Sequence, residues 1–313
     1  MIAFVFPGQG AQKVGMGKSL AAAFPICRDT FAEADDALGE SLSGLCFEGS
    51  EERLSLTENT QPAILAMSVA VSRLVESEGV RAAFAAGHSL GEYSAHVSAG
   101  TLSFADALRT VRRRGRYMQE AVPVGQGAMA AILGLDADGV ARACEEAAAE
   151  VPGEIVTPAN LNAPGQVVIA GHAAAVARAG ERAKARGAKR AIALAVSAPF
   201  HCPLMKPAEE RLAPELRGLA SRDPRVPVVA NVDAEPKRDA GASIEALIRQ
   251  VSSPVRWEDV VRRLIADGAR TFVELGPGTV LAGLIKKIDR SVTVLSVENE
   301  DGLSALDAPG LRT

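Results

Sequence analysis

The decapeptide GHSLGEYSAH, residues 87–96, places the strongest constraint on the fold of this chain. Ser89 stands in the pattern G-x-S-x-G, after a weak strand pattern at 82–87 and before a helical pattern at 90–99. A serine that is presented on a sharp turn between a strand and a helix requires this order of elements. The sequence therefore predicts an α/β fold in which Ser89 is a candidate nucleophile, at a helix start that stabilises negative charge.

A nucleophilic serine needs a base at neutral pH, and the chain has four histidines. His88 adjoins Ser89 and should project away from it along the turn. His96 lies nearly two helical turns further on, about 10 Å away, and His172 starts a predicted helix, where capping is the simpler role. His201, in the loop SAPFHCPLMKP after a predicted strand, is left by elimination as the candidate base.

Residues 127–196 follow a pattern of their own. Their order of strand and helix patterns is β-α-β-β-α-β, which is typical of a ferredoxin-like subdomain. Outside this segment, strand patterns at 2–6, 226–232 and 270–278 alternate with helical ones, which predicts a mainly parallel sheet. We therefore expect a main domain formed by residues 1–126 and 197–313, with residues 127–196 inserted as a smaller domain.

An arginine-rich helix is predicted within residues 103–121. Its apolar positions recur at helical spacing and define one buried stripe, formed by Phe104, Leu108, Val111, Gly115 and Met118. On a helical wheel Arg113 and Arg116 point well away from this stripe, whereas Arg112 and Arg114 flank it. Either of the flanking arginines could therefore reach inward.

The bulk composition excludes several classes of protein. The 313 residues carry a formal net charge of -4, which gives no general attraction to nucleic acid. The four cysteines are scattered without C-x-x-C pairs, which argues against a zinc site or a disulfide framework. No apolar run is long enough to span a bilayer, and the N-terminus does not resemble a secretion signal. We expect a cytoplasmic protein without a membrane partner.

Further motifs converge on a known family. They are FVFPGQGAQ, TQPAI, GHSLGEYSA, RGRYMQEAVP, GAMAAILGL, NLNAPGQVVIAG, SAPFH, NV followed by QVSSPVRW, and ELGPGTVL, in this order from residue 4 to about 281. In these motifs the sequence resembles the malonyl-CoA:acyl carrier protein transacylases of fatty acid synthesis. It is also similar, more distantly, to the acyltransferase domains of polyketide synthases. The resemblance implies an α/β-hydrolase-like main domain with a ferredoxin-like subdomain.

The resemblance also implies roles for individual residues. Ser89 resembles the acylated nucleophile and His201 its base. Arg114 resembles the arginine that pairs with the free carboxylate of the substrate, for which a planar guanidinium is suited. The main-chain carbonyl of Gln250 would orient the histidine, and the family has no acidic third member of the triad.

The oxyanion hole and the pocket follow from the same resemblance. Gln9 and Leu90 would supply backbone N–H groups to the oxyanion, and Leu90 also follows from the turn geometry. Gln61, Asn162 and Phe200 would line the pocket, where the Phe200 ring fills the space that an α-methyl group on the malonyl unit would need. Simpler roles remain open, because Gln9 could be a turn side chain and Asn162 could serve only its hairpin.

The implied reaction needs no metal and no permanently bound cofactor. Malonyl-CoA is the substrate, and acyl carrier protein is the partner that brings the phosphopantetheine thiol. Two alternatives stay open: a serine thioesterase or esterase, and a non-catalytic docking module for carrier protein. The sequence leaves fatty acid and polyketide assembly equally possible. We expect a monomer, with the basic run 184–190 as a candidate docking site or a solvated helix face.

Overall fold

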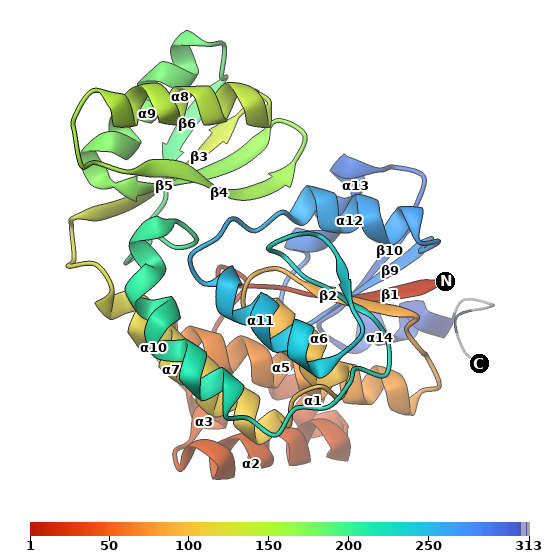
Figure 1. Ribbon diagram of the computed structural model, residues 1–313. Coiled ribbons are helices and arrows are strands. Elements are labelled where there is room, and N and C mark those ends of the chain that lie inside the picture. Colours follow the sequence, from red (N-terminus) through yellow and green to blue (C-terminus); the bar gives the residue numbers. More distant parts are fainter. Residues whose placement is uncertain (308–310, 312–313) are drawn as a thin grey trace.

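The computed structural model describes residues 1–307 and 311, and its largest feature is a six-stranded sheet (Figure 1). The strand order is β10-β9-β1-β2-β7-β8, and all neighbours are parallel except β7 and β8. The predicted mixed α/β architecture with a mainly parallel sheet is therefore confirmed. The strands are β1 (Ile2–Phe6), β2 (Phe84–Gly87), β7 (Val228–Val229), β8 (Pro236–Lys237), β9 (Thr271–Leu275) and β10 (Thr293–Val297).

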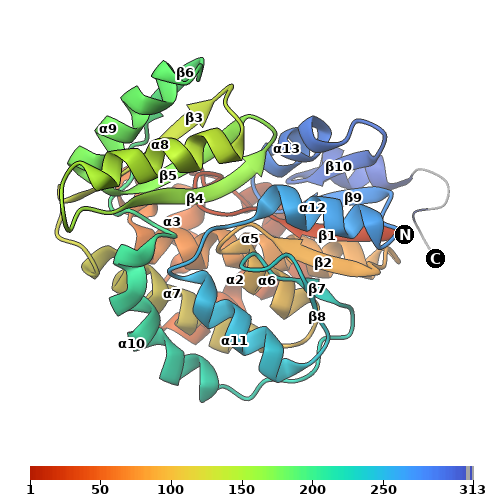
Figure 2. The same cartoon turned by 45° about the horizontal axis from the view of Figure 1, so that its top comes forward.

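Helices pack on both faces of this sheet (Figures 1 and 2). Those before residue 121 are α1 (Lys18–Ala23), α2 (Pro25–Leu38), α3 (Leu42–Glu48), α4 (Glu51–Ser55), α5 (Thr57–Ser77), α6 (Gly91–Ser98) and α7 (Phe104–Glu120). Those after residue 200 are α10 (Lys206–Arg217), α11 (Ala240–Gln250), α12 (Trp257–Ala266), α13 (Val280–Ile288) and α14 (Glu300–Ser304), with the 3₁₀ turns η1 (Pro203–Met205) and η2 (Ala305–Asp307).

The alternation of side chains along β1 explains why both faces are covered. Phe4 and Phe6 join one apolar cluster with residues of α2, α5, α6 and α7. Ala3 and Val5 join a second cluster with residues of α12 and α13. Successive strand residues point to opposite faces of a sheet, so a strand that is apolar throughout needs helices on both sides.

A second sheet of four antiparallel strands has the order β4-β5-β3-β6. Its elements are β3 (Gly127–Leu133), α8 (Ala137–Ala149), β4 (Val156–Ala163), β5 (Gln166–His172), α9 (Ala173–Ala185) and β6 (Arg190–Ala193). α8 and α9 pack on one face through an alanine-rich cluster. Met129, Ala159 and Ala170 on the other face join the cluster of the main layer. The two sheets are therefore parts of one packed body.

Backbone hydrogen bonds also join the two sheets. Leu161 donates to the carbonyl of Val255 over 2.9 Å, and Val255 donates to the carbonyl of Ala159 over 2.9 Å. Val255 lies two residues before α12, so β4 is held against the helix layer of the main sheet (Figure 2).

Some predicted elements are shorter in the structure. The strand predicted at 226–232 pairs only at β7, because Ala230 donates to Glu235 and the chain turns back into β8. Ala234 in this turn has a positive φ of 57°. The strand pattern at 188–196 forms β6 only, and Leu194 and Val196 line a pocket instead. Within the described residues, no helix combines the length and apolarity that a membrane crossing requires.

His96 on α6 is fully buried, and neither of its ring nitrogens has a hydrogen-bond partner among the described residues. Burial lowers its pKa from 6.5 to about 3. Below pH 6.5, His96 therefore binds a proton in the unfolded chain, whereas in the folded chain it binds one only below about pH 3. His96 thus lowers the stability of the fold as the pH falls through this window.

We predict that His96→Leu raises the free energy of unfolding, because leucine removes two unsatisfied buried polar atoms worth about 1–3 kcal/mol. The gain should be larger at pH 5 than at pH 7.5, since the variant also loses the proton linkage. Urea unfolding at both pH values measures this. Equal stability of wild type and variant at both pH values would mean that the ring nitrogens are satisfied by bound water.

Candidate active site

Ser89 lies on a strained turn between β2 and α6. Its φ is 52°, a left-handed conformation that non-glycine residues rarely adopt. The two flanking glycines are explained by close packing. A Cβ on Gly87 would lie 1.9 Å from the Gly91 carbonyl carbon, and a Cβ on Gly91 would lie 2.0 Å from the Phe6 carbonyl oxygen. The motif therefore lets α6 start directly against β1 and β2.

Asn231 holds this turn in place, a role that the sequence did not indicate. Its Oδ1 accepts a hydrogen bond from the Ser89 backbone N–H over 2.7 Å, and its Nδ2 donates to the Gly87 carbonyl over 2.7 Å. The side chain is fully buried. Asn231 directly follows Ala230, where the chain turns away from β7. The strained backbone at Ser89 is thus tied down from the neighbouring strand.

His201 faces Ser89 from the loop between β6 and η1. Its Nε2 lies 2.6 Å from Ser89 Oγ, and its Nδ1 lies 3.0 Å from the main-chain carbonyl of Gln250. Because a carbonyl only accepts, Nδ1 carries the proton and Nε2 is free to accept one. Burial, and next the positive charge of Arg114, lower the pKa of His201 to about 3. The imidazole is therefore neutral in the unliganded protein.

Arg114, and not Arg112, points inward from α7. Its side chain is 1% exposed, and NH1 donates to Gln61 Oε1 over 2.8 Å. NH2 donates to Gln250 Oε1 over 2.9 Å and to Ser89 Oγ over 3.1 Å. Arg112 instead pairs with Glu40 at the surface. The choice between the two flanking arginines, open from the helical wheel, is settled in favour of Arg114.

Two features of the surroundings make Arg114 unusual. Gly115 allows α7 to approach α5, since a Cβ there would lie 2.7 Å from the Thr57 carbonyl oxygen. No carboxylate of the described residues lies within 4 Å of the Arg114 guanidinium, although the Tyr93 ring lies 5.4 Å away. A buried cation without a direct counter-ion is costly, and burial lowers the pKa of Arg114. Such a group can accept an anion from outside.

A pocket of about 130 Å³ opens above these groups. Of the predicted pocket residues, Gln61 and Phe200 line it, but Asn162 does not. Asn162 Oδ1 lies 2.8 Å from His88 Nε2, and the nearby Asn160 lines the pocket instead. The full lining is Gln9, Gln61, His88, Ser89, Arg114, Met118, Met129, Asn160, Leu194, Val196, Phe200 and His201.

Of the two residues predicted to form an oxyanion hole, Gln9 lines this pocket and Leu90 does not. Gln9 lines the pocket from the loop after β1, and its side chain reaches Thr57 Oγ1 over 3.4 Å. Leu90 is the N-cap residue of α6, directly after Ser89. No acceptor among the described residues takes the backbone N–H of Gln9 or Leu90. These N–H groups are therefore free to bind an anion.

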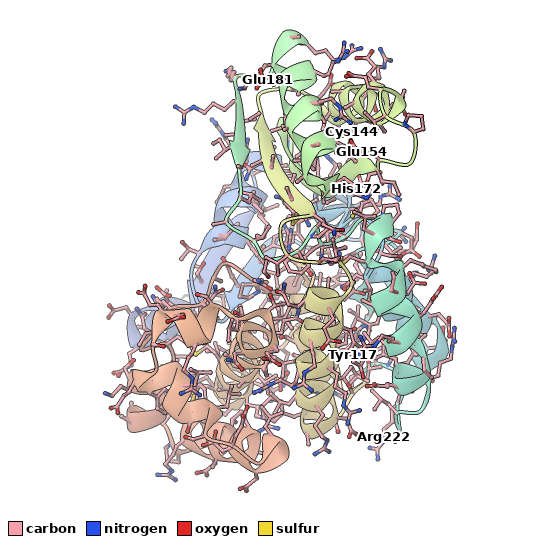
Figure 3. All side chains as sticks on the ribbon, turned by 90° about the vertical axis from the view of Figure 1, so that its left-hand side faces the viewer. Tyr117, Cys144, Glu154, His172, Glu181 and Arg222 are labelled. Atoms are coloured by element: carbon pink, nitrogen blue, oxygen red, sulfur yellow. The ribbon has the colours of Figure 1, made fainter. Side chains whose placement is uncertain are left out.

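The other histidines lie in different surroundings. The His88 ring packs 5.7 Å from the Trp257 ring, and its bond to Asn162 holds it there. His172 lies where β5 meets α9 (Figure 3), and its Nδ1 accepts from the Ile155 N–H over 2.8 Å. It therefore does not cap α9 with its side chain, unlike the simpler role expected for it.

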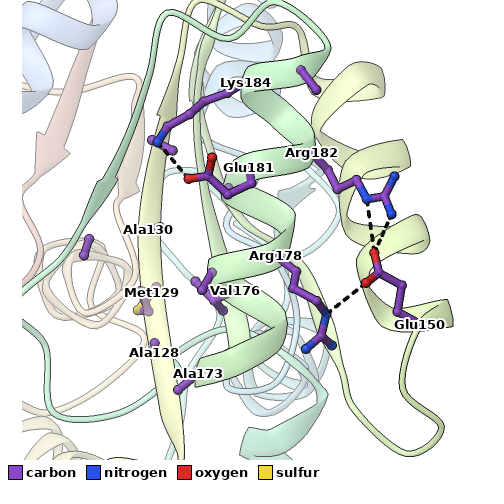
Figure 4. A pocket seen from close by; sticks show the side chains of 15 residues that line it. Ala128, Met129, Ala130, Glu150, Ala173, Val176, Arg178, Glu181, Arg182 and Lys184 are labelled. Carbon is purple, nitrogen blue, oxygen red and sulfur yellow. Dashed lines mark hydrogen bonds and ion pairs between the residues drawn. The ribbon is translucent and has the colours of Figure 1, made fainter.

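A larger cavity of about 710 Å³ lies away from Ser89, between α9, β3 and β6 (Figure 4). Alanines form much of its wall, and Met129 lines both this cavity and the pocket at Ser89. Charged residues at its rim are paired with each other, as Lys184 with Glu181 and Arg182 with Glu150. The residues that line it include no histidine, cysteine or serine, so the smaller pocket is the candidate active site.

The comparisons with known proteins identify the family of the chain. The family model described as acyl transferase domain matches residues 3–305. The chain therefore belongs to the acyl transferase domain family, as its motifs predicted.

The two similar proteins described next are both named malonyl CoA-acyl carrier protein transacylase. One from Escherichia coli (strain K12) is 52% identical over 304 residues, with 97% of each chain covered. One from Bacillus subtilis (strain 168) is 51% identical over 300 residues, covering 96% of this chain and 94% of the relative.

Solved structures agree equally well. An acyl carrier protein S-malonyltransferase from Vibrio cholerae has a TM-score of 0.95 at 48% identity, covering 97% of this chain and 99% of that one. A malonyl-transacylase in complex with a type II PKS acyl-carrier protein has a TM-score of 0.94 at 50% identity, covering 97% and 98%.

We predict that Asn231→Ala lowers the free energy of unfolding by about 2 kcal/mol, because two buried backbone groups lose their partner. It should also slow the reaction of Ser89 with a fluorophosphonate probe, since the turn is no longer held. Urea unfolding and probe labelling measure the two effects. Asn59→Ala is the control, because Asn59 makes one hydrogen bond to Arg53 at the surface. Similar losses in both variants would contradict a special role for Asn231.

Proposed function

We propose that this protein transfers the malonyl group from malonyl-CoA to the phosphopantetheine thiol of acyl carrier protein, through a malonyl ester on Ser89. The observation that carries the proposal is the buried guanidinium of Arg114, which has no direct counter-ion and lies 3.1 Å from Ser89 Oγ. A hydrolase of neutral esters has no use for such a cation. An enzyme whose acyl group ends in a carboxylate does.

In the first step His201 Nε2 takes the proton of Ser89 Oγ while the oxygen attacks the thioester carbonyl. A tetrahedral oxyanion forms, and the backbone N–H groups of Gln9 and Leu90 stabilise it, each donor being worth about 3 kcal/mol. The C–S bond then breaks, and the imidazolium returns its proton to the leaving thiolate, so coenzyme A departs as the thiol. The carbonyl of Gln250 holds His201 in the tautomer that both transfers need.

In the second step the phosphopantetheine thiol of the carrier protein attacks the malonyl ester. His201 takes the thiol proton and gives it to Ser89 Oγ as the C–O bond breaks. The thioester is re-formed on the carrier protein and the serine is regenerated. No metal or bound cofactor enters either step, and the coenzyme A and phosphopantetheine arrive with the substrates.

Arg114 connects substrate choice to the base. Its charge is the second cause, after burial, that keeps the pKa of His201 low. A substrate carboxylate paired with Arg114 offsets this repulsion, so the pKa of His201 rises when a malonyl group is bound. The base is then stronger with a malonyl group than with an acetyl group in the pocket. Gln61 orients the guanidinium, and Phe200 restricts the space beside His201.

The relatives support both metabolic settings. The names of the curated relatives state the transacylase activity and no pathway, and one similar structure is a complex with a type II PKS acyl-carrier protein. The product, a malonyl thioester on carrier protein, is an extender unit for fatty acid or polyketide chains. All four cations of the basic run 184–190 are exposed. Lys184 and Arg186 are paired with Glu181 and Glu146, which leaves Lys189 and Arg190 as the cations without an ion pair among the described residues, available to an acidic carrier protein.

For the fold, we infer an α/β-hydrolase-like main domain of residues 1–126 and 197–313. Residues 127–196 form a ferredoxin-like subdomain. The order β3-α8-β4-β5-α9-β6 and the antiparallel sheet order support the second assignment. The connection from α7 into β3 and the path from β6 to His201 support boundaries near residues 126 and 197. The protein acts as a monomer in the cytoplasm.

We predict that Ser89→Ala abolishes covalent loading, because no other residue receives the acyl group. Mass spectrometry after exposure to malonyl-CoA should find one added malonyl group on the wild type and none on the variant. Release of malonate without loading of the protein would instead indicate a thioesterase. If the protein is not loaded and no malonate is released, the protein is a docking module. Loading at another residue would contradict the assignment of Ser89.

We predict that Arg114→Ala slows malonyl transfer about 100-fold or more, because a buried carboxylate left unpaired costs a few kcal/mol. Acetyl transfer, which involves no carboxylate, should fall less, so the malonyl preference is lost. The ratio of kcat/KM for the two thioesters measures this. Arg112→Ala is the matched control, because Arg112 lies on the same helix and pairs with Glu40. A preserved malonyl preference in Arg114→Ala would identify another cation as the carboxylate site.

A further inference from the structure

Glu92 lies beneath the site without touching the pocket. It sits in the first turn of α6 and is fully buried. A helix-terminal glutamate is ordinarily a solvated charge that favours the helix dipole, which is the simpler role its position suggests. Its Oε2 instead accepts hydrogen bonds from the Asn231 backbone N–H over 3.0 Å and from Gln250 Nε2 over 2.8 Å.

The Gln250 side chain joins Glu92 to Arg114. Gln250 Nε2 donates to Glu92, while Gln250 Oε1 accepts from Arg114 NH2 over 2.9 Å. The same Nε2 also donates to the Ser89 carbonyl over 2.9 Å. In this single orientation, the Gln250 amide therefore links the buried Glu92 carboxylate to the buried Arg114 guanidinium and to the turn at Ser89. Both charges are desolvated, so their interaction is screened far less than at a surface.

We propose that Glu92 is a positioning residue that serves as the indirect counter-ion of Arg114 in the free protein, and that it takes up a proton when the carboxylate of a malonyl group binds there. The proposal rests on the proposed function of Arg114. The physical reason is charge balance. One buried cation compensates one buried anion, so the arrival of a second anion favours the neutral form of Glu92.

The surroundings of Glu92 support this exchange. Burial raises its pKa to about 7, against the opposing effects of its hydrogen bonds and of Arg114 on α7. Asp233, after β7, also raises it, and Tyr93 is the neighbouring titratable group on α6. The second oxygen, Oε1, has no hydrogen-bond partner among the described residues. A proton can therefore occupy Oε1 while Oε2 keeps both of its bonds, so protonation does not disturb Gln250.

Direct measurement of the proton is the first test. Calorimetry of malonyl-CoA binding to the Ser89→Ala protein, near pH 7.5 in buffers of different ionisation enthalpy, should detect uptake of a fraction of a proton. Acetyl-CoA is the ligand control, because it has the same phosphates and no carboxylate. Equal proton uptake with both ligands, or none with malonyl-CoA, would overturn the proposal.

The second test uses Glu92→Gln, in which an amide oxygen can still accept from Gln250 and Asn231 but no proton titrates. In the wild type, KM for malonyl-CoA should rise about tenfold from pH 6 to pH 8.5, because the ionised Glu92 opposes the incoming carboxylate. A tenfold change in affinity is within the usual range of coupling between two linked sites. In Glu92→Gln this KM should stay flat and low. A merely structural role for Glu92 would leave the pH profile unchanged.

Glu274→Gln is the matched control. Glu274 is also fully buried with a pKa raised by burial to about 7, but it binds the N-terminal N–H groups of α13 at Leu281 and Ala282. It should keep the wild-type pH profile. If Glu92→Gln retains the wild-type profile while Arg114→Ala loses the malonyl preference, the proposal for Glu92 fails and the function stands. If Arg114→Ala keeps the malonyl preference, the proposed function of Arg114 is wrong.

Discussion

The buried charge of Arg114 is the interaction on which the rest of the site depends. A guanidinium that is 1% exposed depends on hydrogen bonds, because its hydration has been lost, and its Nε has no partner among the described residues. Three acceptors surround it, on α5, on the turn before α6 and at the end of α11. These elements come from distant parts of the chain, so the requirements of one side chain fix how the helices around the pocket are arranged.

The mainly parallel character of the sheet could be predicted from local patterns, but its strand order was not predicted. The apolar β1 run and the strand–turn–helix order around Ser89 depend on neighbours in the sequence, and both were found where they were expected. The order of elements between residues 127 and 196 was equally local. α10 was not predicted, because Pro214 lies inside it and proline usually breaks a helix. β7 was predicted too long, since the turn at Ala230 is stabilised by contacts with β8.

The site separates into parts that the sequence could and could not indicate. Ser89 was found from its motif, and Arg114 was narrowed to two candidates by helical periodicity before the resemblance selected one. Asn231 and Gln250 belong to the motifs NV and QVSSPVRW, but a motif does not indicate what their side chains contact, because these hydrogen bonds join residues more than 130 positions apart in the chain. Asn162 was expected in the pocket but contacts His88. Asn160 and Asn162 lie two residues apart, so the alternation of side chains along a strand does not show which of them faces the pocket. The strand β4 is also irregular, with register shifts on both sides of Asn160.

The backbone angles at Ser89 and His201 have an evolutionary consequence. Both residues have a positive φ, and within the described part of the chain only Ala234 shares this property outside glycine. Each such angle costs on the order of 1–3 kcal/mol, a strain that glycine would relieve. Selection for thermal robustness alone would therefore favour glycine at the two positions that carry the chemistry. A library screened only for stability would therefore be expected to accumulate inert proteins.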